Sequence, residues 1–126
     1  MATQQYTIMV VDDEDNIRLL YKEELEEEGY KIAAAASGEE ALEILSKVNP
    51  DLIVMDIKMP GMSGVETLIK VKEIDKNIPV ILCSAYGDYK QDFTTWASDA
   101  YVVKAASLDE LKRSIIEVLE KRYPQK

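Results

Sequence analysis

The stretch Leu52-Ile53-Val54-Met55-Asp56 decides the fold of this chain. Four apolar residues lead directly into a carboxylate, and residues 57–64, which follow, are rich in turn-forming proline and glycine. A short apolar run bounded by such residues is typical of a buried strand. We therefore expect Asp56 at the carboxyl end of that strand, where open α/β sheets bind their ligands.

Strand and helix signals alternate five times along the chain. The predicted strands are 6–11, 31–35, 52–55, 79–84 and 100–103. The predicted helices are 14–28, 37–48, 63–74 and 88–97, with a last one that starts at 107. Short connections between such units indicate an α/β fold with one five-stranded, doubly wound parallel sheet and helices on both faces. We expect residues 1–126 to form a single domain.

Three of the predicted helix starts carry the capping-box pattern Ser-x-x-Glu. In this pattern the serine oxygen accepts from a first-turn N–H, and the glutamate accepts from the serine N–H. The pattern occurs at Ser37–Glu40, Ser63–Glu66 and Ser107–Glu110. The apolar spacing also predicts that Leu20, Val48, Ile69 and Ile74 face the core.

The composition excludes several classes of function. A formal net charge of −9 argues against direct binding to nucleic acid or to an anionic membrane surface, and no apolar run is long enough to span a membrane. The first residues lack the basic and apolar parts of a signal peptide, and Cys83 is the single cysteine, so we expect a cytoplasmic protein. The chain has no histidine, which excludes histidine catalysis and a phosphohistidine here.

Polar side chains follow four of the five predicted strands. Because parallel strands end at the same edge of a sheet, these residues are expected to converge. They are Asp12, Asp13, Asp56, Ser84 and Lys104. Three close carboxylates repel one another unless a cation joins them, and an open all-oxygen site favours Mg²⁺. A magnesium ion beside a free carboxylate and an ammonium group suits the transfer of a phosphoryl group.

Five stretches of the chain resemble the receiver domains of two-component response regulators, in particular the single-domain chemotaxis type. The matching stretches are 10–14, 50–56, 59–64, 84–85 and 101–104. The resemblance implies a flavodoxin-like fold with strand order 2-1-3-4-5. It also implies that the protein is a signalling phosphoprotein in a two-component system or phosphorelay. Such a protein is no enzyme, although it assists its own phosphorylation and dephosphorylation.

The resemblance assigns roles to the residues at the sheet edge. Asp56 matches the residue that accepts a phosphoryl group from a partner phosphohistidine, forming an aspartyl phosphate. The partner is a histidine kinase or a histidine phosphotransfer protein. Asp12, Asp13 and Asp56, together with the backbone carbonyl of Lys58, match the Mg²⁺ ligands.

The resemblance also implies a conformational switch. Ser84 and Lys104 match the residues that bind the phosphoryl group, and Tyr101 matches an aromatic residue that turns inward with them. The face made by the helix at 88–97, the last strand and the last helix then changes, and a downstream target protein binds it.

The chain departs from the family pattern in two places. Ala105 stands where the family usually has proline, so we expect a trans Lys104–Ala105 bond. Residues 97–98 replace the usual glycine near the end of the fourth helix, which we expect to be short or mobile. The main alternative function is an unphosphorylated receiver-like interaction module. A flavodoxin-type electron carrier is disfavoured because the carboxylates after the first strand would repel its phosphate. A haloacid-dehalogenase-type phosphatase has two aspartates that flank one residue at a strand end, and it is disfavoured because neither Asp12 nor Asp56 is followed two residues later by an aspartate.

Overall fold

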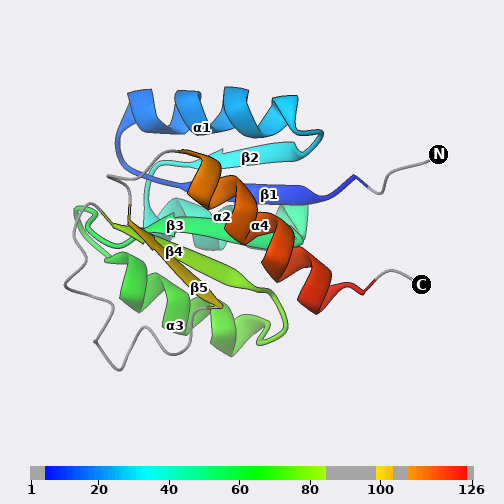
Figure 1. Cartoon of the computed structure of the whole chain (residues 1–126). Coiled ribbons are helices and arrows are strands. Elements are labelled where there is room, and N and C mark those ends of the chain that lie inside the picture. The colour runs from blue at the N-terminus through cyan, green and yellow to red at the C-terminus, as the bar shows by residue number, and fades with distance from the viewer. Residues whose placement is uncertain (1–4, 85–98, 104–107, 125–126) are drawn as a thin grey trace.

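Five parallel strands form one sheet in the order β2-β1-β3-β4-β5, which confirms the predicted fold and strand order. The computed structural model describes residues 5–84, 99–103 and 108–124, and for residues 84 and 103 it describes the backbone alone. The strands are β1 (Thr7–Val11), β2 (Lys31–Ala35), β3 (Leu52–Asp56), β4 (Val80–Ser84) and β5 (Ala100–Val103) (Figure 1). All five strands were predicted within one residue at each end.

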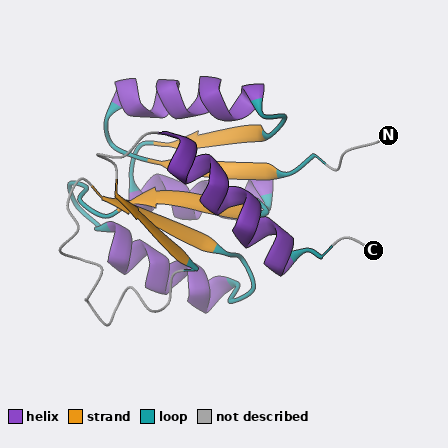
Figure 2. Ribbon diagram, viewed as in Figure 1, coloured by secondary structure: helices purple, strands orange, loops and turns teal. Residues whose placement is uncertain are grey.

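Four helices cover the two faces of the sheet in the described part of the chain. They are α1 (Asp15–Glu27), α2 (Gly38–Val48), α3 (Gly64–Ile74) and α4 (Leu108–Arg122). Helices α1 and α4 pack on one face, while α2 and α3 pack on the other (Figure 2). The helix predicted at 88–97, the cap predicted at Ser107 and the Lys104–Ala105 bond lie outside the described residues.

Two hydrophobic cores share the sheet, and alternate residues of each strand point into one or the other. Met9 and Ile53 belong to the core beneath α2 and α3, whereas Ile8 and Leu52 belong to the core beneath α1 and α4. This alternation follows from the two-residue period of a strand. Every residue of β3 is buried, so the strand that ends in Asp56 lies at the centre of the molecule.

The serine caps predicted for α2 and α3 are present. At Ser63 the capping box is complete: its side chain accepts from the Glu66 N–H at 3.2 Å, and Glu66 accepts from the Ser63 N–H at 3.0 Å. At Ser37 the serine half forms, but the Glu40 carboxylate accepts from the Ala36 N–H at 2.6 Å instead. The prediction that Glu40 accepts from the Ser37 N–H was therefore wrong, because Glu40 accepts from the N–H of the preceding residue.

Four predictions of inward-facing residues were wrong. The exposed fraction is 41% for Leu20, 37% for Val48, 45% for Ile69 and 63% for Ile74. The buried side of α3 instead consists of Gly64, Thr67, Leu68 and Val71. Two of these four residues are small rather than apolar, so a search for apolar spacing misplaced the buried stripe of this helix.

Candidate functional site

Asp12 follows the last residue of β1 and is almost completely buried, with 2% of its surface exposed. Its N–H donates to the Ala35 carbonyl at 3.1 Å, which continues the pairing with β2 by one residue. Its carboxylate accepts from the Glu14 N–H at 2.9 Å. The turn between β1 and α1 therefore holds the Asp12 carboxylate at the sheet edge.

Arg18, near the start of α1, also stabilises the connection between β1 and α1. Its guanidinium donates to the Asp12 carbonyl at 2.7 Å and forms an ion pair with Asp15. Sequence reasoning missed this residue. The available signal was a cation near a helix N-terminus, where the helix dipole disfavours positive charge, so that a local partner is expected.

Asp56 is the last residue of β3 and has 7% of its surface exposed. It lies beside Cys83 of β4 in the register of the sheet. The next residue, Ile57, donates its N–H to the Cys83 carbonyl at 3.1 Å. The position of Asp56 is therefore fixed at the end of a central strand that pairs with β1 on one side and β4 on the other.

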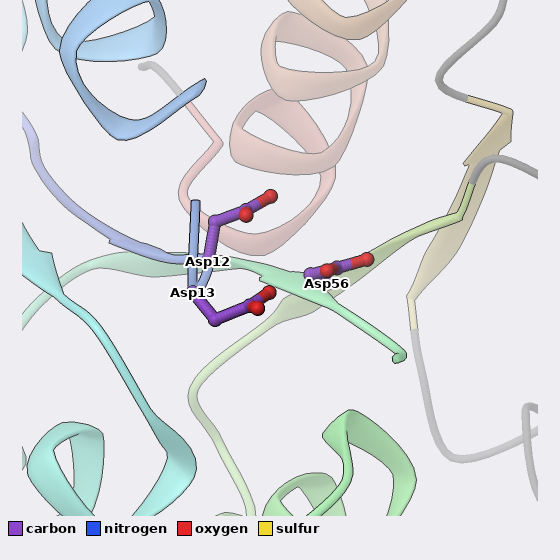
Figure 3. Close-up of side chains that lie close together, drawn as sticks. All are labelled: Asp12, Asp13 and Asp56. Carbon is purple, nitrogen blue, oxygen red and sulfur yellow. The ribbon is translucent and has the colours of Figure 1, made fainter. Parts of the chain in front are cut away.

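The carboxylates of Asp12, Asp13 and Asp56 meet at the ends of the neighbouring strands β1 and β3 (Figure 3). One oxygen from each residue lies within 4.8 Å of the other two. Asp13 is exposed, so the cluster opens to solvent on one side. Three anionic oxygen donors with an open side suit a hard divalent cation that keeps some of its waters, as Mg²⁺ does. The donor set in this structure therefore fits the predicted metal.

Four further residues were predicted to belong to the site. Lys58 is exposed and lies two residues beyond Asp56. Tyr101 lies in β5, is half-buried and packs against the core beneath α2 and α3. The backbone of Ser84 ends β4, whereas its side chain and the whole of Lys104 are outside the described residues. The predicted roles of these four residues stay predictions.

The response regulator receiver domain family matches residues 8–116. The chain belongs to this family. It is a receiver domain of the two-component response regulators, which are signalling proteins. Receiver domains bind Mg²⁺, in agreement with the carboxylate cluster.

Relatives of this receiver domain include both short and long proteins. Sporulation initiation phosphotransferase F of Bacillus subtilis is 40% identical over 110 residues, which cover 86% of this chain and 89% of that protein. Regulatory protein AtoC of Escherichia coli is 33% identical over 90% of this chain, which spans 25% of that protein.

A solved structure of the response regulator protein TrrA from Thermotoga maritima, in complex with Mg(2+)-BeF, superimposes with a TM-score of 0.87. It is 48% identical to this receiver domain, and the match covers 90% of this chain and 99% of TrrA. Among the helices that the structure describes, none is long and apolar enough to cross a membrane.

Proposed function

We propose that Asp56 accepts a phosphoryl group from a phosphohistidine on a histidine kinase or a histidine phosphotransfer protein. The observation that carries this proposal is the carboxylate cluster at the ends of β1 and β3 in a receiver domain. Two similar structures support it. TrrA, at 48% identity, has been solved in complex with Mg(2+)-BeF and in complex with the histidine kinase ThkA.

Asp12, Asp13, Asp56 and the backbone carbonyl of Lys58 would hold Mg²⁺ in this proposal. When bound, the ion supplies positive charge that offsets the repulsion among the carboxylates and neutralises the oxygens of the transferring phosphoryl group. The protein's own part is to keep the carboxylates in place. Asp12 is held by the Glu14 N–H and, through its carbonyl, by Arg18.

Asp56 acts as the nucleophile. One of its carboxylate oxygens forms the new P–O bond while the P–N bond to the donor imidazole breaks, and the imidazole leaves with the electron pair and takes up a proton. Ser84 and Lys104 then bind the phosphoryl oxygens, and the side chain of Tyr101 in β5 turns inward. The changed face of β5, α4 and residues 88–97 binds a downstream target protein.

We also propose that residues 1–126 form one receiver domain, which works in the cytoplasm without direct contact with nucleic acid or membrane. The net charge of −9 supports this because phosphate backbones and anionic lipid surfaces attract basic proteins. The domain is a phosphoacceptor that assists its own phosphorylation and dephosphorylation rather than an enzyme with a separate substrate.

Intact-mass analysis after incubation with acetyl phosphate and Mg²⁺ tests the proposal. The parent protein should gain one phosphoryl group that hydroxylamine removes, and Asp56→Asn should gain none. The substitution replaces one oxygen by nitrogen, so circular dichroism should show an unchanged fold. Labelling of Asp56→Asn would place the acceptor elsewhere, and an unlabelled parent would favour the unphosphorylated interaction module.

A further inference from the structure

Gly64 is the first residue of α3 and is buried against the peptide that follows Asp56. A Cβ atom built on Gly64 would lie 2.1 Å from the carbonyl oxygen of Asp56 and 2.8 Å from the Cα atom of Ile57. Both are backbone atoms, so they can move away only if the end of β3 moves. Helix α3 therefore starts in direct contact with the strand end, and this contact leaves no room for a side chain.

Hydrogen bonds hold the same backbone from two sides. The Ile57 N–H donates to the Cys83 carbonyl of β4 at 3.1 Å, and the Ile57 carbonyl accepts from the Gly64 N–H at 2.8 Å. The backbone after Asp56 is thus fixed between β4 and the start of α3. Because this backbone carries the acceptor carboxylate, the place where α3 begins also sets the position of that carboxylate relative to Asp12 and Asp13.

We infer that Gly64 is a positioning residue for phosphoryl transfer to Asp56, an inference that rests on the proposed function. Because Gly64 has no side chain, α3 can begin against the Asp56 carbonyl. This contact holds the Asp56 carboxylate in line with the phosphoryl donor. A misplacement of about 1 Å at a reacting group lowers a rate by roughly 10²-fold. We therefore expect Gly64→Ala to lower the maximal phosphorylation rate at saturating Mg²⁺ by about tenfold or more.

Helix α2 offers a matched control, because Ser37-Gly38 repeats the Ser63-Gly64 pair at a helix start. Gly38 is also buried, and a Cβ atom there would lie 2.1 Å from the Thr67 hydroxyl oxygen. That oxygen ends a side chain, which can turn away by giving up its hydrogen bond to the Ser63 carbonyl. Gly38→Ala therefore disturbs the Thr67 side chain near the start of α3 but leaves the backbone bonds of Ile57 to Gly64 and to Cys83 in place. Its rate per folded molecule should fall much less than that of Gly64→Ala.

The test measures labelling of the full chain by acetyl phosphate across a Mg²⁺ titration. Urea unfolding gives the folded fraction of each variant, and rates are expressed per folded molecule. A maximal rate about tenfold or more below the parent's in Gly64→Ala, with a much smaller change in Gly38→Ala, supports the inference. An unchanged maximal rate per folded Gly64→Ala molecule, whatever its loss of stability, overturns it.

A second pair of variants decides the question if Gly64→Ala does not fold. Ser63→Ala removes the bond from the Glu66 N–H and loosens the start of α3 without adding atoms, while Ser37→Ala removes the equivalent bond from the Glu40 N–H. A severalfold slower rate in Ser63→Ala alone supports the inference, and equal rates in the two variants overturn it.

The same experiment separates the inference from the function on which it rests. An unlabelled parent, or labelling that survives in Asp56→Asn, refutes the proposed function and the inference together. A parent labelled only at Asp56, with an unchanged rate in Gly64→Ala, refutes the inference alone.

Discussion

Asp13 is the exposed member of a cluster of three like charges. Two unit charges about 4 Å apart repel by roughly 1 kcal/mol in water and about 4 kcal/mol in a partly buried site. Asp13→Ala should therefore raise the free energy of unfolding by about 1–3 kcal/mol without Mg²⁺. It should also weaken Mg²⁺ binding and slow phosphorylation, because a ligand is lost. Urea unfolding with and without Mg²⁺ measures the changes in stability and in Mg²⁺ binding, and labelling by acetyl phosphate measures the rate.

Glu23→Ala is the control for that experiment, since it removes the same charge from an exposed position on α1. Its unfolding should respond to Mg²⁺ as the parent's does. If Asp13→Ala were stabilised by Mg²⁺ as strongly as the parent, Asp13 would not be a ligand.

Burial raises the pKa of Tyr30 above its ordinary value of 10.0, and the nearby charge of Glu28 raises it further. Above pH 10 the unfolded chain loses this proton before the folded chain does, so the free energy of unfolding falls as the pH rises through the folded pKa. Tyr30→Phe should show a smaller fall between about pH 8 and about pH 11 in urea titrations. The same decline in the variant and the parent would mean that Tyr30 ionises alike in both states.

Among the contacts between elements, Tyr123 binds the end of α4 to the sheet at the amino end of β3. The carboxylate cluster lies at the other end of that strand. Its hydroxyl donates to the Asp51 carbonyl at 3.0 Å, and its ring packs on Tyr6 with centroids 5.7 Å apart. Tyr123→Phe should keep the ring contact and lose the hydrogen bond, at a cost of about 1 kcal/mol. Tyr123→Ala should lose both and unfold at a lower urea concentration than Tyr123→Phe; equal midpoints would show that the ring contributes nothing.

The strands could be predicted because each one is an apolar run between turn residues, whereas their order followed from the resemblance to receiver domains. Because parallel strands end at one edge of the sheet, the convergence of Asp12, Asp13 and Asp56 could also be predicted. The buried side of α3 could not be predicted in the same way. Gly64 and Thr67 are buried there because α3 lies close to backbone and to α2, and a search for apolar residues does not detect close approach. The position of Arg18 near a helix N-terminus indicates that it needs a local partner, but the choice of the Asp12 carbonyl depends on the shape of the turn.

At the scale of the whole molecule, the two cores are expected to unfold together because they share one sheet. Leu68 and Ile115 are fully buried, one in each core. Leu68→Ala and Ile115→Ala should each lower the free energy of unfolding by about 2–5 kcal/mol within a single transition. Ile74→Ala, at a side chain with 63% exposure, should change it by less than about 0.5 kcal/mol. Two separate transitions in either core variant would contradict this expectation.

The position of β1 between β2 and β3 has a consequence for biosynthesis. This strand is made first, yet one of its two partners is β3, and the bond between the Thr7 N–H and the Asp51 carboxylate joins residues 44 positions apart. At about 5–20 residues per second, a ribosome needs several seconds to make that interval. A nascent chain arrested before residue 52 carries Asp12 and Asp13 without their third partner. Mg²⁺ affinity in arrested chains of increasing length would therefore report when β1 and β3 join, and strong affinity before β3 is complete would show that the strand pair is not required.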